Sequence, residues 1–384
     1  MGQLCIYLTP FASDYSGACS ALFDLDCITA INDAGCCTSH YVYYDEPRWN
    51  DKVRPVFSTA IRNIDSILGN DDKIINVICE AASKIDNEMI AVIGTPVPAL
   101  TGMDMDGIAA EIEFRTGKPA FGFNTTGFDY YDKGIYEAGR ALIDRFAVPL
   151  EIVLGRVNIC GMTPLDFGNC GNDKLIEQEL EKEGFEIGCR FFMGITRTQI
   201  ENCASAELNI VVSSAGLKIA KYLKKKFGMP YRVGFPFGEN SSKKIADSIK
   251  KIECKADKRM LIIADQVIGN SLRAELEKNG YDPEKMTVAT FFGFDSGIAQ
   301  AQDIHFKEEA EYLSLLKEGR FDVLIGDPHI INIPPTESLE KIQVVHPAVS
   351  SELGWNEAEL LDGRFVDRIM EQIQNINSGE KNGI

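Results

Sequence analysis

The stretch MIAVIGTPVPALTGMDMDGIAAEIEFRTGKPAFGFNT, residues 89–125, decides the fold class. It begins with a short apolar run rich in β-branched residues, MIAVIGT (89–95), and ends with a second such run, PAFGFNT (119–125). Two short strands separated by a segment of helical length form the βαβ unit of a parallel sheet. The stretch therefore predicts an α/β fold.

The same alternation continues along most of the chain. Amphipathic stretches lie between the apolar runs, and one of them, residues 72–86, places Ile74, Ile75 and Ile78 on a single helix face. Further strands are predicted at residues 150–160, 208–214, 259–265, 286–293 and 321–327. Most of these strands end in a loop of Gly, Ser, Thr or Asp, as is usual where parallel strands meet a ligand-binding edge.

Changes in composition divide the chain into parts. AVPLEIVLG (147–155) opens a new strand after a complete helix, and a polar run at 239–259 precedes another strand. We therefore predict an N-terminal α/β domain over residues 1–150, a middle domain over 151–255 and a third over 256–350. Residues 351–384 are expected to hold an amphipathic helix, at about 356–376, and a frayed tail.

The charge balance excludes some partners. The 384-residue chain has 57 acidic and 39 basic side chains, a formal net charge of −18, which would repel a nucleic acid or an anionic membrane surface. No window approaches 18 uninterrupted apolar residues, and the N-terminus lacks the pattern of a signal peptide. These features predict a cytoplasmic protein.

The motifs that are missing narrow the chemistry. The sequence has no Walker A motif, no strand-linked GxGxxG, no HExxH, no GxSxG and no CxxC pair. Eleven cysteines in a chain of this type indicate either core packing or soft-metal binding, and not a disulfide framework. We assign Cys5, Cys79, Cys189, Cys203 and Cys254 to packing.

The first fifty residues differ from the rest, because they are dense in Gly, Ser, Asp and Cys and indicate loops around one short helix. Three motifs follow one another here: Ser13-Asp14-Tyr15-Ser16-Gly17-Ala18, Gly35-Cys36-Cys37 and Asp45-Glu46-Pro47-Arg48. In this order they resemble the nitrogenase component 1 superfamily. Later segments, among them RVNICG (156–161) and the region 206–231, match further landmarks of that family in order.

The resemblance implies three Rossmann-like or flavodoxin-like parallel-sheet domains around a central cleft. It also exposes departures. Ser13 stands where the family has its first cluster cysteine, and Pro96-Val97 stands where it has the third. Ser213 occupies approximately the position of the cysteine that anchors the iron-molybdenum cofactor, so we expect no such cofactor and no reduction of dinitrogen.

An iron-sulfur cluster is still implied by the resemblance. Clusters usually need four ligands, and two copies of Cys36 and Cys37 would supply four thiolates across a dimer boundary. The predicted metal ligands are Cys37, Cys36 and Cys19, and the implied cofactor is a four-iron four-sulfur cluster. The alternative is that these cysteines are small packing residues, since adjacent cysteines point in different directions outside a tight loop.

Other candidates surround these ligands or lie at strand ends. Asp14, Asp45, Arg48 and Tyr130 are predicted cofactor-binding residues, with solvated loop charges as the alternative for the first three. The predicted catalytic residues are His346 and His329, which follow strands of the third domain and would supply protons. Loops 126–134, 159–170 and 326–335 are expected to line the cleft, with ordinary domain contacts as the alternative.

These inferences leave three hypotheses. The chain is a nitrogenase component 1-like reductase of a small organic or tetrapyrrole-like substrate, working as a homodimer or with a paralogous subunit. Its electrons would come from an ATP-dependent iron protein, since this chain has no P-loop. Alternatively, it is a non-catalytic cluster carrier or assembly scaffold, or a metal-free ligand-binding protein of the same fold.

Overall fold

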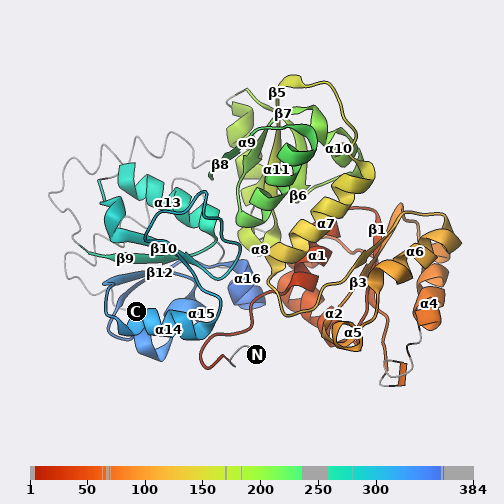
Figure 1. Cartoon of the computed structure of the whole chain (residues 1–384), viewed down its shortest axis with the longest axis horizontal. Coiled ribbons are helices and arrows are strands. Elements are labelled where there is room, and N and C mark those ends of the chain that lie inside the picture. The colour runs from red at the N-terminus through yellow and green to blue at the C-terminus, as the bar shows by residue number, and fades with distance from the viewer. Residues whose placement is uncertain are drawn as a thin grey trace.

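The computed structural model describes residues 5–62, 64–65, 69, 71–168, 171–182, 184–235, 258–278, 280–355 and 358. Its strands form three parallel sheets, each with helices on its faces. Figure 1 shows the three bodies side by side, with the helices α1, α7, α8 and α16 where they meet. The α/β fold class is confirmed.

The first sheet has the strand order β2-β1-β3-β4 and is parallel throughout. Its strands are β1 (Cys27–Ile31), β2 (Val56–Ser58), β3 (Met89–Ile93) and β4 (Ala120–Phe123). The prediction of loops around one short helix in the first fifty residues is wrong here, because β1 is a fully buried inner strand. Its five residues, CITAI, are too few to show a period that separates a strand from a loop.

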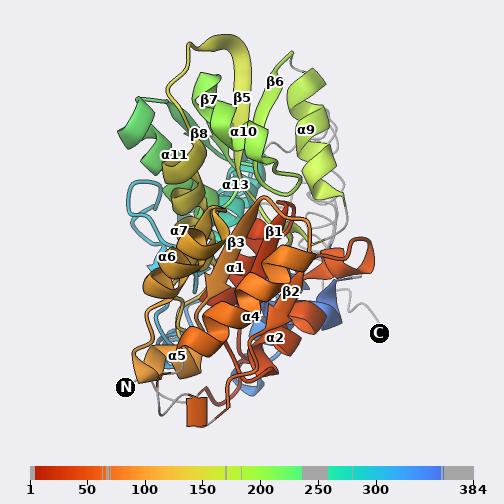
Figure 2. The ribbon, with the colours of Figure 1, turned by 90° about the vertical axis from the view of Figure 1, so that its right-hand side faces the viewer.

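Two helix layers cover this sheet. On its outer face, toward the viewer in Figure 2, lie α4 (Asp71–Lys84) and α6 (Met105–Thr116). Their isoleucines pack with β1 and β3 in one hydrophobic cluster. On the inner face lie α1 (Asp14–Leu22) and α7 (Tyr131–Phe146), which belong to the core that continues into the other two sheets.

Helices α1 and α7 approach each other closely because both carry glycine at the contact. A Cβ on Gly17 would lie 2.0 Å from the carbonyl oxygen of Tyr131, and one on Gly134 would lie 1.8 Å from that of Asp14. Backbone hydrogen bonds from Asp14 to Asp129 and from Tyr131 to Ala12 fix the starts of both helices together. The Ser16-Gly17-Ala18 motif therefore has a packing reason.

The second sheet has the order β6-β5-β7-β8. Its strands are β5 (Val153–Met162), β6 (Glu186–Phe192), β7 (Ala206–Val211) and β8 (Tyr231–Val233), with helices α8 (Pro164–Phe167), α9 (Asn172–Lys182), α10 (Arg197–Asn202) and α11 (Ser214–Phe227). Cys160, Cys189 and Cys203 are buried in this body, as predicted for Cys189 and Cys203. Cys170 and Cys254 lie outside the described residues.

The third sheet has the order β11-β10-β9-β12-β13. Its strands are β9 (Met260–Ile263), β10 (Met286–Thr290), β11 (Ile304–His305), β12 (Val323–Gly326) and β13 (Glu340–Gln343), with helices α13 (Gln266–Lys278) and α14 (Glu309–Lys317). The Glu309 carboxylate accepts hydrogen bonds from the backbone of Ile6, Tyr7 and Leu8, at 2.6–2.7 Å. The N-terminal segment is therefore fixed to this third body, and Cys5 is exposed, not packed as predicted.

Short helices complete the described chain. They are α2 (Cys36–His40), η1 (Tyr41–Asp45), η2 (Pro47–Asn50), α5 (Pro96–Thr101), η3 (Cys203–Ser205), η4 (Pro283–Lys285), α15 (Pro328–Ile331), η5 (Pro334–Thr336), α16 (Pro347–Ser350) and η6 (Ser351–Gly354). The C-terminal helix predicted at about 356–376 falls outside the described residues. Among the helices that the structure describes, none is long and apolar enough to cross a membrane.

Candidate functional site

The first candidate region is the cysteine-loop site, where Tyr15 lies beside Ser13 and Cys37, and Cys37 in turn lies beside Thr95. Burial raises the pKa of the Cys37 thiol, and hydrogen bonding to Tyr15 and Thr95 acts in the opposite direction. Burial likewise raises the pKa of Tyr15, whereas the hydroxyl of Ser13 lowers it. Three segments distant in sequence, around residues 13, 37 and 95, thus converge.

Cys36 and Cys37 begin helix α2, which the left-handed Gly35 starts at a φ of 110°. Cys36 is exposed, whereas Cys37 is half-buried and packs against the main core. The two thiols therefore differ in environment. Among the described residues, no three His, Cys, Asp or Glu side chains converge in a group that could hold a metal ion.

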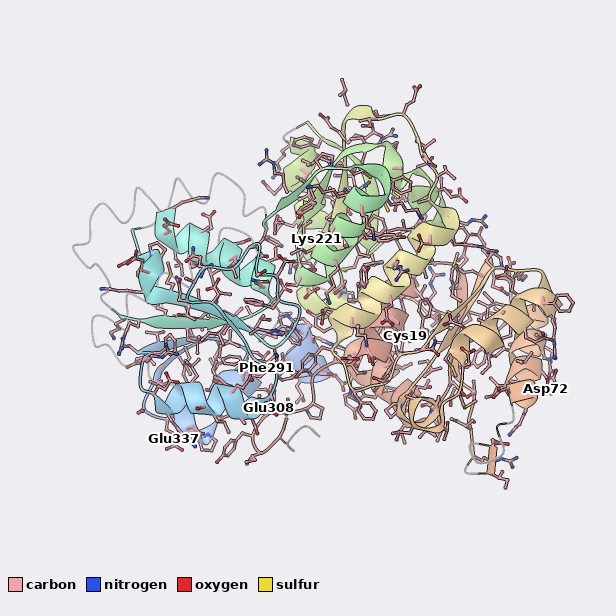
Figure 3. All side chains as sticks on the ribbon, viewed as in Figure 1. Cys19, Asp72, Lys221, Phe291, Glu308 and Glu337 are labelled. Atoms are coloured by element: carbon pink, nitrogen blue, oxygen red, sulfur yellow. The ribbon has the colours of Figure 1, made fainter. Side chains whose placement is uncertain are left out.

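Cys19 lies on α1 inside the first body, and its side chain is 1% exposed. Figure 3 shows it in the interior, far from the outer edge marked by Asp72. Burial, with the nearby Cys27 as the next cause, raises the pKa of the Cys19 thiol well above its usual value. Its role as a metal ligand stays a prediction, and it would require a neutral, enclosed thiol to lose its proton.

Asp14 and Asp45 are both buried and hydrogen-bonded within the chain. The Asp14 carboxylate accepts from the backbone N–H groups of Thr126 and Gly127, at 2.8 and 2.7 Å. Asp45 accepts from the hydroxyl of Ser16 at 2.6 Å, and its carboxylate lies 3.4 Å from Nε2 of His40. The hydrogen bonds of both carboxylates hold loops of the chain in place. Binding of a cofactor by Asp14 and Asp45 stays a prediction.

Arg48 is buried and enclosed by acceptors of its own chain. Its guanidinium donates to Glu46 Oε1 at 2.7 Å, to Asp24 Oδ2 at 2.7 Å and to the carbonyl oxygen of Ser20 at 2.7 Å. It also lies over the ring of Phe23, 4.4 Å from the ring centroid. These contacts use the guanidinium nitrogens and one face of the guanidinium plane, so Arg48 holds its own chain together. Its binding to a cofactor stays a prediction.

The second candidate region is the interdomain junction, where the three bodies meet around Tyr131, Asp166 and His346. The hydroxyl of Tyr131, from α7, donates to Oδ1 of Asp166 on α8. Nε2 of His346, at the start of α16, lies 3.7 Å from the same oxygen. The imidazole stacks on Phe292 with ring centroids 5.0 Å apart. Tyr131 of loop 126–134 and Asp166 of loop 159–170 thus both contact the third body or lie beside it.

Two further carboxylates hold the helix starts around this junction. Asp265, after β9, accepts from the backbone of Ser214 at 2.9 Å and from that of Val267 at 2.9 Å. It therefore joins the first turn of α11 to the first turn of α13, which belong to different bodies. Asp327, after β12, accepts from the backbone of His346 at 2.8 Å and so fixes the start of α16.

Titration at the junction is strongly perturbed. Burial and the charge of Asp265 raise the pKa of Asp166 well above its usual range, against hydrogen bonds from Tyr131 and Thr163. Burial lowers the pKa of His346 to about 4. The histidine is therefore neutral at pH 7, and neither of its ring nitrogens has a hydrogen-bond partner.

The junction has little free space. Asp166, Asn172, Ile263 and His346 are among the residues that line a cavity of about 30 Å³, enough for about two water molecules. Ser213 is buried nearby, and its hydroxyl donates to the carbonyl oxygen of Gly161 at 2.8 Å. Among the described residues, this cavity has room for water-sized molecules.

The other predicted residues lie at the edge of the junction or outside it. Tyr130 packs in an aromatic group with Phe11 and Phe292. His329 lines a separate pocket of about 330 Å³ that also includes Tyr7. The two predicted catalytic histidines therefore do not line the same cavity, although Asp327 accepts a hydrogen bond from the backbone of each.

Sequence reasoning missed Asp166, Asp265 and Asp327 as site residues. A usable signal existed for two of them, because Asp265 and Asp327 are the first charged residues after the apolar strands β9 and β12. Asp166 had no such signal. It follows β5 within a four-residue helix, and only the packing of α16 on that helix and the hydrogen bond from Tyr131 of α7 make it central.

A family model matches most of the chain. The family model described as "Nitrogenase component 1 type Oxidoreductase" matches residues 14–275. The chain therefore belongs to this family, an oxidoreductase family whose members bind iron-sulfur clusters.

Individual relatives are distant. The chain is 27% identical over 228 residues to the nitrogenase iron-molybdenum cofactor biosynthesis protein NifE of Clostridium pasteurianum, covering 57% of this chain and 49% of that protein. It is 24% identical over 317 residues to the nitrogenase molybdenum-iron protein alpha chain of the same organism, covering 76% and 57%. The chain thus spans about half the length of these relatives.

A solved structure, "Nitrogenase Cp1 at pH 6.5", matches the whole fold. It superposes with a TM-score of 0.75 at 13% identity and covers 100% of this chain and 96% of that one. At this identity the match establishes the arrangement of the three sheets and not a shared activity.

Proposed function

We propose that this chain is a nitrogenase component 1-like oxidoreductase subunit that holds an iron-sulfur cluster at a subunit boundary and reduces a small organic molecule. The observation that carries the proposal is that Ser13 and Thr95 lie on either side of the contacting pair Tyr15 and Cys37. These are three segments at which the family resemblance implies cluster cysteines. Their proximity supports a cluster position here, although only one of the three expected cysteines, Cys37, is present in this chain.

A single chain does not supply a complete set of ligands. Iron-sulfur clusters usually take four thiolates, and here Cys36 and Cys37 offer two. Cys36 is exposed, so a second subunit could approach it. Two subunits related by a two-fold axis would bring four thiols together, which is the arrangement that the proposal requires.

The surface around the cysteine-loop site favours such an approach. Large apolar side chains are exposed there, on η1, η6 and α5: Tyr43, Tyr44, Val97, Leu100 and Leu353. The hydroxyl of Ser351 bonds to the backbone of Tyr44, so η1 and η6 form one continuous surface. Apolar surface gathered beside exposed thiols is typical of an interface between subunits.

The junction supports a role in reduction. When bound, a cluster would supply electrons, and the chain's own residues would supply protons. Backbone hydrogen bonds between residues 12–14 and 129–131 connect the cysteine-loop site to Tyr131 at the junction. The cavity of about 30 Å³ would have to widen to admit a substrate, since drug-sized ligands occupy pockets of about 300–1,000 Å³.

The electrons would come from a separate ATP-dependent iron protein. No Walker A motif occurs in the whole sequence, so this chain has no obvious means of coupling ATP hydrolysis to electron transfer. We expect the purified chain to hydrolyse no ATP by itself. ATPase activity that copurifies with the chain through successive columns would contradict this division of labour.

The decisive experiment is anaerobic purification followed by iron and sulfide analysis and electron paramagnetic resonance of the dithionite-reduced protein. The proposal expects iron in proportion to dimers and a spectrum of a reduced cluster. A monomeric, iron-free chain that cannot be reconstituted with iron and sulfide would instead identify a metal-free member of the family.

A cluster or cofactor scaffold is the second candidate, and one observation favours it. The junction encloses only about 30 Å³ and has Ser213 bonded to the backbone of its own body. One relative is named as a cofactor biosynthesis protein. Transfer of iron from the loaded chain to an apoprotein acceptor, without turnover in the presence of a reductase, would favour this function over the first.

A further inference from the structure

The junction contains two buried carboxylates that no cation neutralises. Asp166 and Asp265 are both buried, and the charge of one raises the pKa of the other. No lysine or arginine of the described chain forms an ion pair with either. Lys218, on α11, pairs with Asp132 at 2.8 Å. Two enclosed like charges are costly, so one of the two groups is expected to hold a proton.

The donors around each carboxylate show which one holds it. Asp265 accepts from backbone N–H groups of Ser214, Val267 and Ile268. An amide nitrogen can only donate, so these three bonds are strongest when Asp265 is ionised. The two helix N-termini also favour a negative charge at this place.

Asp166 has partners of another kind. Its oxygens contact the hydroxyls of Tyr131 and Thr163, and a hydroxyl can donate or accept. Both contacts therefore survive when Asp166 carries a proton. The third neighbour, His346, offers a lone pair on one ring nitrogen and has no partner for it.

We propose that Asp166 is a neutral carboxylic acid at neutral pH, holds the junction's proton and directs it toward Nε2 of His346. The present separation of 3.7 Å is too long for a hydrogen bond, and an approach of about 0.5–1 Å would form one. Such a bond would satisfy a buried imidazole nitrogen that otherwise has no hydrogen-bond partner. His346 is thus the acceptor, and Asp166 the proton-holding residue.

The other titratable groups nearby are accounted for. Tyr131 faces Asp166 from α7 and is itself kept protonated, since burial raises the pKa of its hydroxyl. Asp327, on the far side of His346, bonds to the backbone of His346 and to the hydroxyl of Ser350. On α1, Asp14 is held by the backbone of loop 126–127.

This inference concerns the chain alone and needs no bound cluster. Only its consequence for catalysis, that the proton is delivered to a reduced substrate, rests on the proposed function. The two can therefore fail separately. An iron-free preparation of the full chain would refute a cluster-based reductase and would still report on Asp166.

Infrared spectroscopy of the full chain with ¹³C-labelled aspartate tests the proposal. At pH 7 we expect a carbonyl stretching band of a protonated carboxylic acid that shifts with the label and disappears in Asp166→Asn. The matched variant Asp265→Asn should keep the band, because burial, the first cause of the raised pKa of Asp166, is unchanged in that variant. It should also unfold more readily than Asp166→Asn, because its new NH₂ group opposes an amide donor.

Two outcomes would overturn the proposal: no protonated carboxyl band in the wild-type chain at pH 7, or a band lost in Asp265→Asn and kept in Asp166→Asn. If Asp166→Asn does not fold, Tyr131→Phe gives a second reading. Removing the tyrosine hydroxyl from Oδ1 should shift the frequency of the band. A band of unchanged frequency in Tyr131→Phe would show that the proton lies on another carboxyl.

Discussion

The cysteine-loop site and the interdomain junction differ in almost every physical respect. The first lies at the surface, with Cys36 exposed and apolar side chains around it. The second is enclosed, with about 30 Å³ of free space and a buried group of two carboxylates, a tyrosine and a neutral histidine. The backbone bonds between residues 12–14 and 129–131 join them.

Each region lacks something that its proposed role requires, and the two regions lack different things. The cysteine-loop site lacks ligands, and a second subunit can supply them from outside. The junction lacks space, and no outside partner can supply that while the three bodies stay closed. The first region is therefore expected to respond to changes in its thiols, and the second to changes in protonation.

The largest effect is expected when the cysteine-loop site loses its half-buried thiol. Cys37→Ala should remove most of the iron of the anaerobically purified chain, since a ligand set that needs two thiols from each subunit cannot be completed. Cys79→Ala is the matched control, because Cys79 is a partly buried cysteine of α4 on the outer face of the first sheet. Iron per chain and the oligomeric state measure the result.

Cys36→Ala refines this test. Equal iron loss in Cys36→Ala and Cys37→Ala would support two-plus-two ligation. Unchanged iron content and unchanged dimerisation in both variants would show that the cysteine loop has a structural role only. The comparison of a metal-binding region with the interdomain junction would then have no basis.

The next effect tests whether Arg48 is structural. Arg48→Met leaves the buried Glu46 without its partner, and breaking a buried pair on one side costs about 3–5 kcal/mol of unfolding free energy. Lys52→Met is the control, since Lys52 pairs with the same Asp24 but is exposed, and such pairs are worth about 0–1 kcal/mol. Urea unfolding of the two variants, monitored by circular dichroism, measures the difference.

An Arg48→Met chain as stable as wild type that nevertheless fails to retain iron would reverse this interpretation. Arg48 would then act on the cofactor, as the family motif around it predicts.

The sequence was sufficient for most of the fold and not for all of it. Strands such as β3 and β9 have uninterrupted apolar runs that are buried on both faces, and the βα alternation around them predicted parallel sheets. Strand β1 was missed because five residues with a cysteine and a threonine lie in a stretch dominated by polar residues. This segment forms a strand because it pairs with β2 and β3, and the sequence of the segment alone carries no information about that pairing.

The site was less accessible to sequence reasoning for a related reason. His346 was predicted as a cleft residue from its place after a strand, and it does line the junction cavity. His329 has a similar place but lines another pocket, because α15 turns its side chain toward the N-terminal segment. The partnership of Tyr131 with Asp166 joins residues 35 positions apart through helix packing, so no motif records it.

The third prediction concerns the pH response of the junction. The pKa of His346 is lowered to about 4, so between pH 6.5 and 4 the unfolded chain binds a proton that the folded chain does not. This contribution to stability is present above pH 6.5 and is lost as the pH falls toward 4. It amounts to about 3 kcal/mol, since each pKa unit corresponds to about 1.4 kcal/mol.

His346→Phe should remove this pH dependence while it preserves the stacking on Phe292. The measurement is the difference in unfolding free energy between wild type and variant at several pH values from 7 to 4. A difference that stays constant over this range would mean that His346 titrates normally and that the junction is hydrated.

The smallest effect is expected from Ser213→Cys, which places a thiol at the position where the resemblance implies a cofactor anchor. The serine hydroxyl donates to the carbonyl oxygen of Gly161 at 2.8 Å, and a thiol is a weaker donor, so the variant should lose about 0.5–1.5 kcal/mol of stability. Iron per chain should stay the same, because a cavity of about 30 Å³ has no room for a cluster. Extra iron in Ser213→Cys, absent from Ser213→Ala, would show that the junction opens far enough to admit one, and the contrast between an open site and a closed one would then no longer hold.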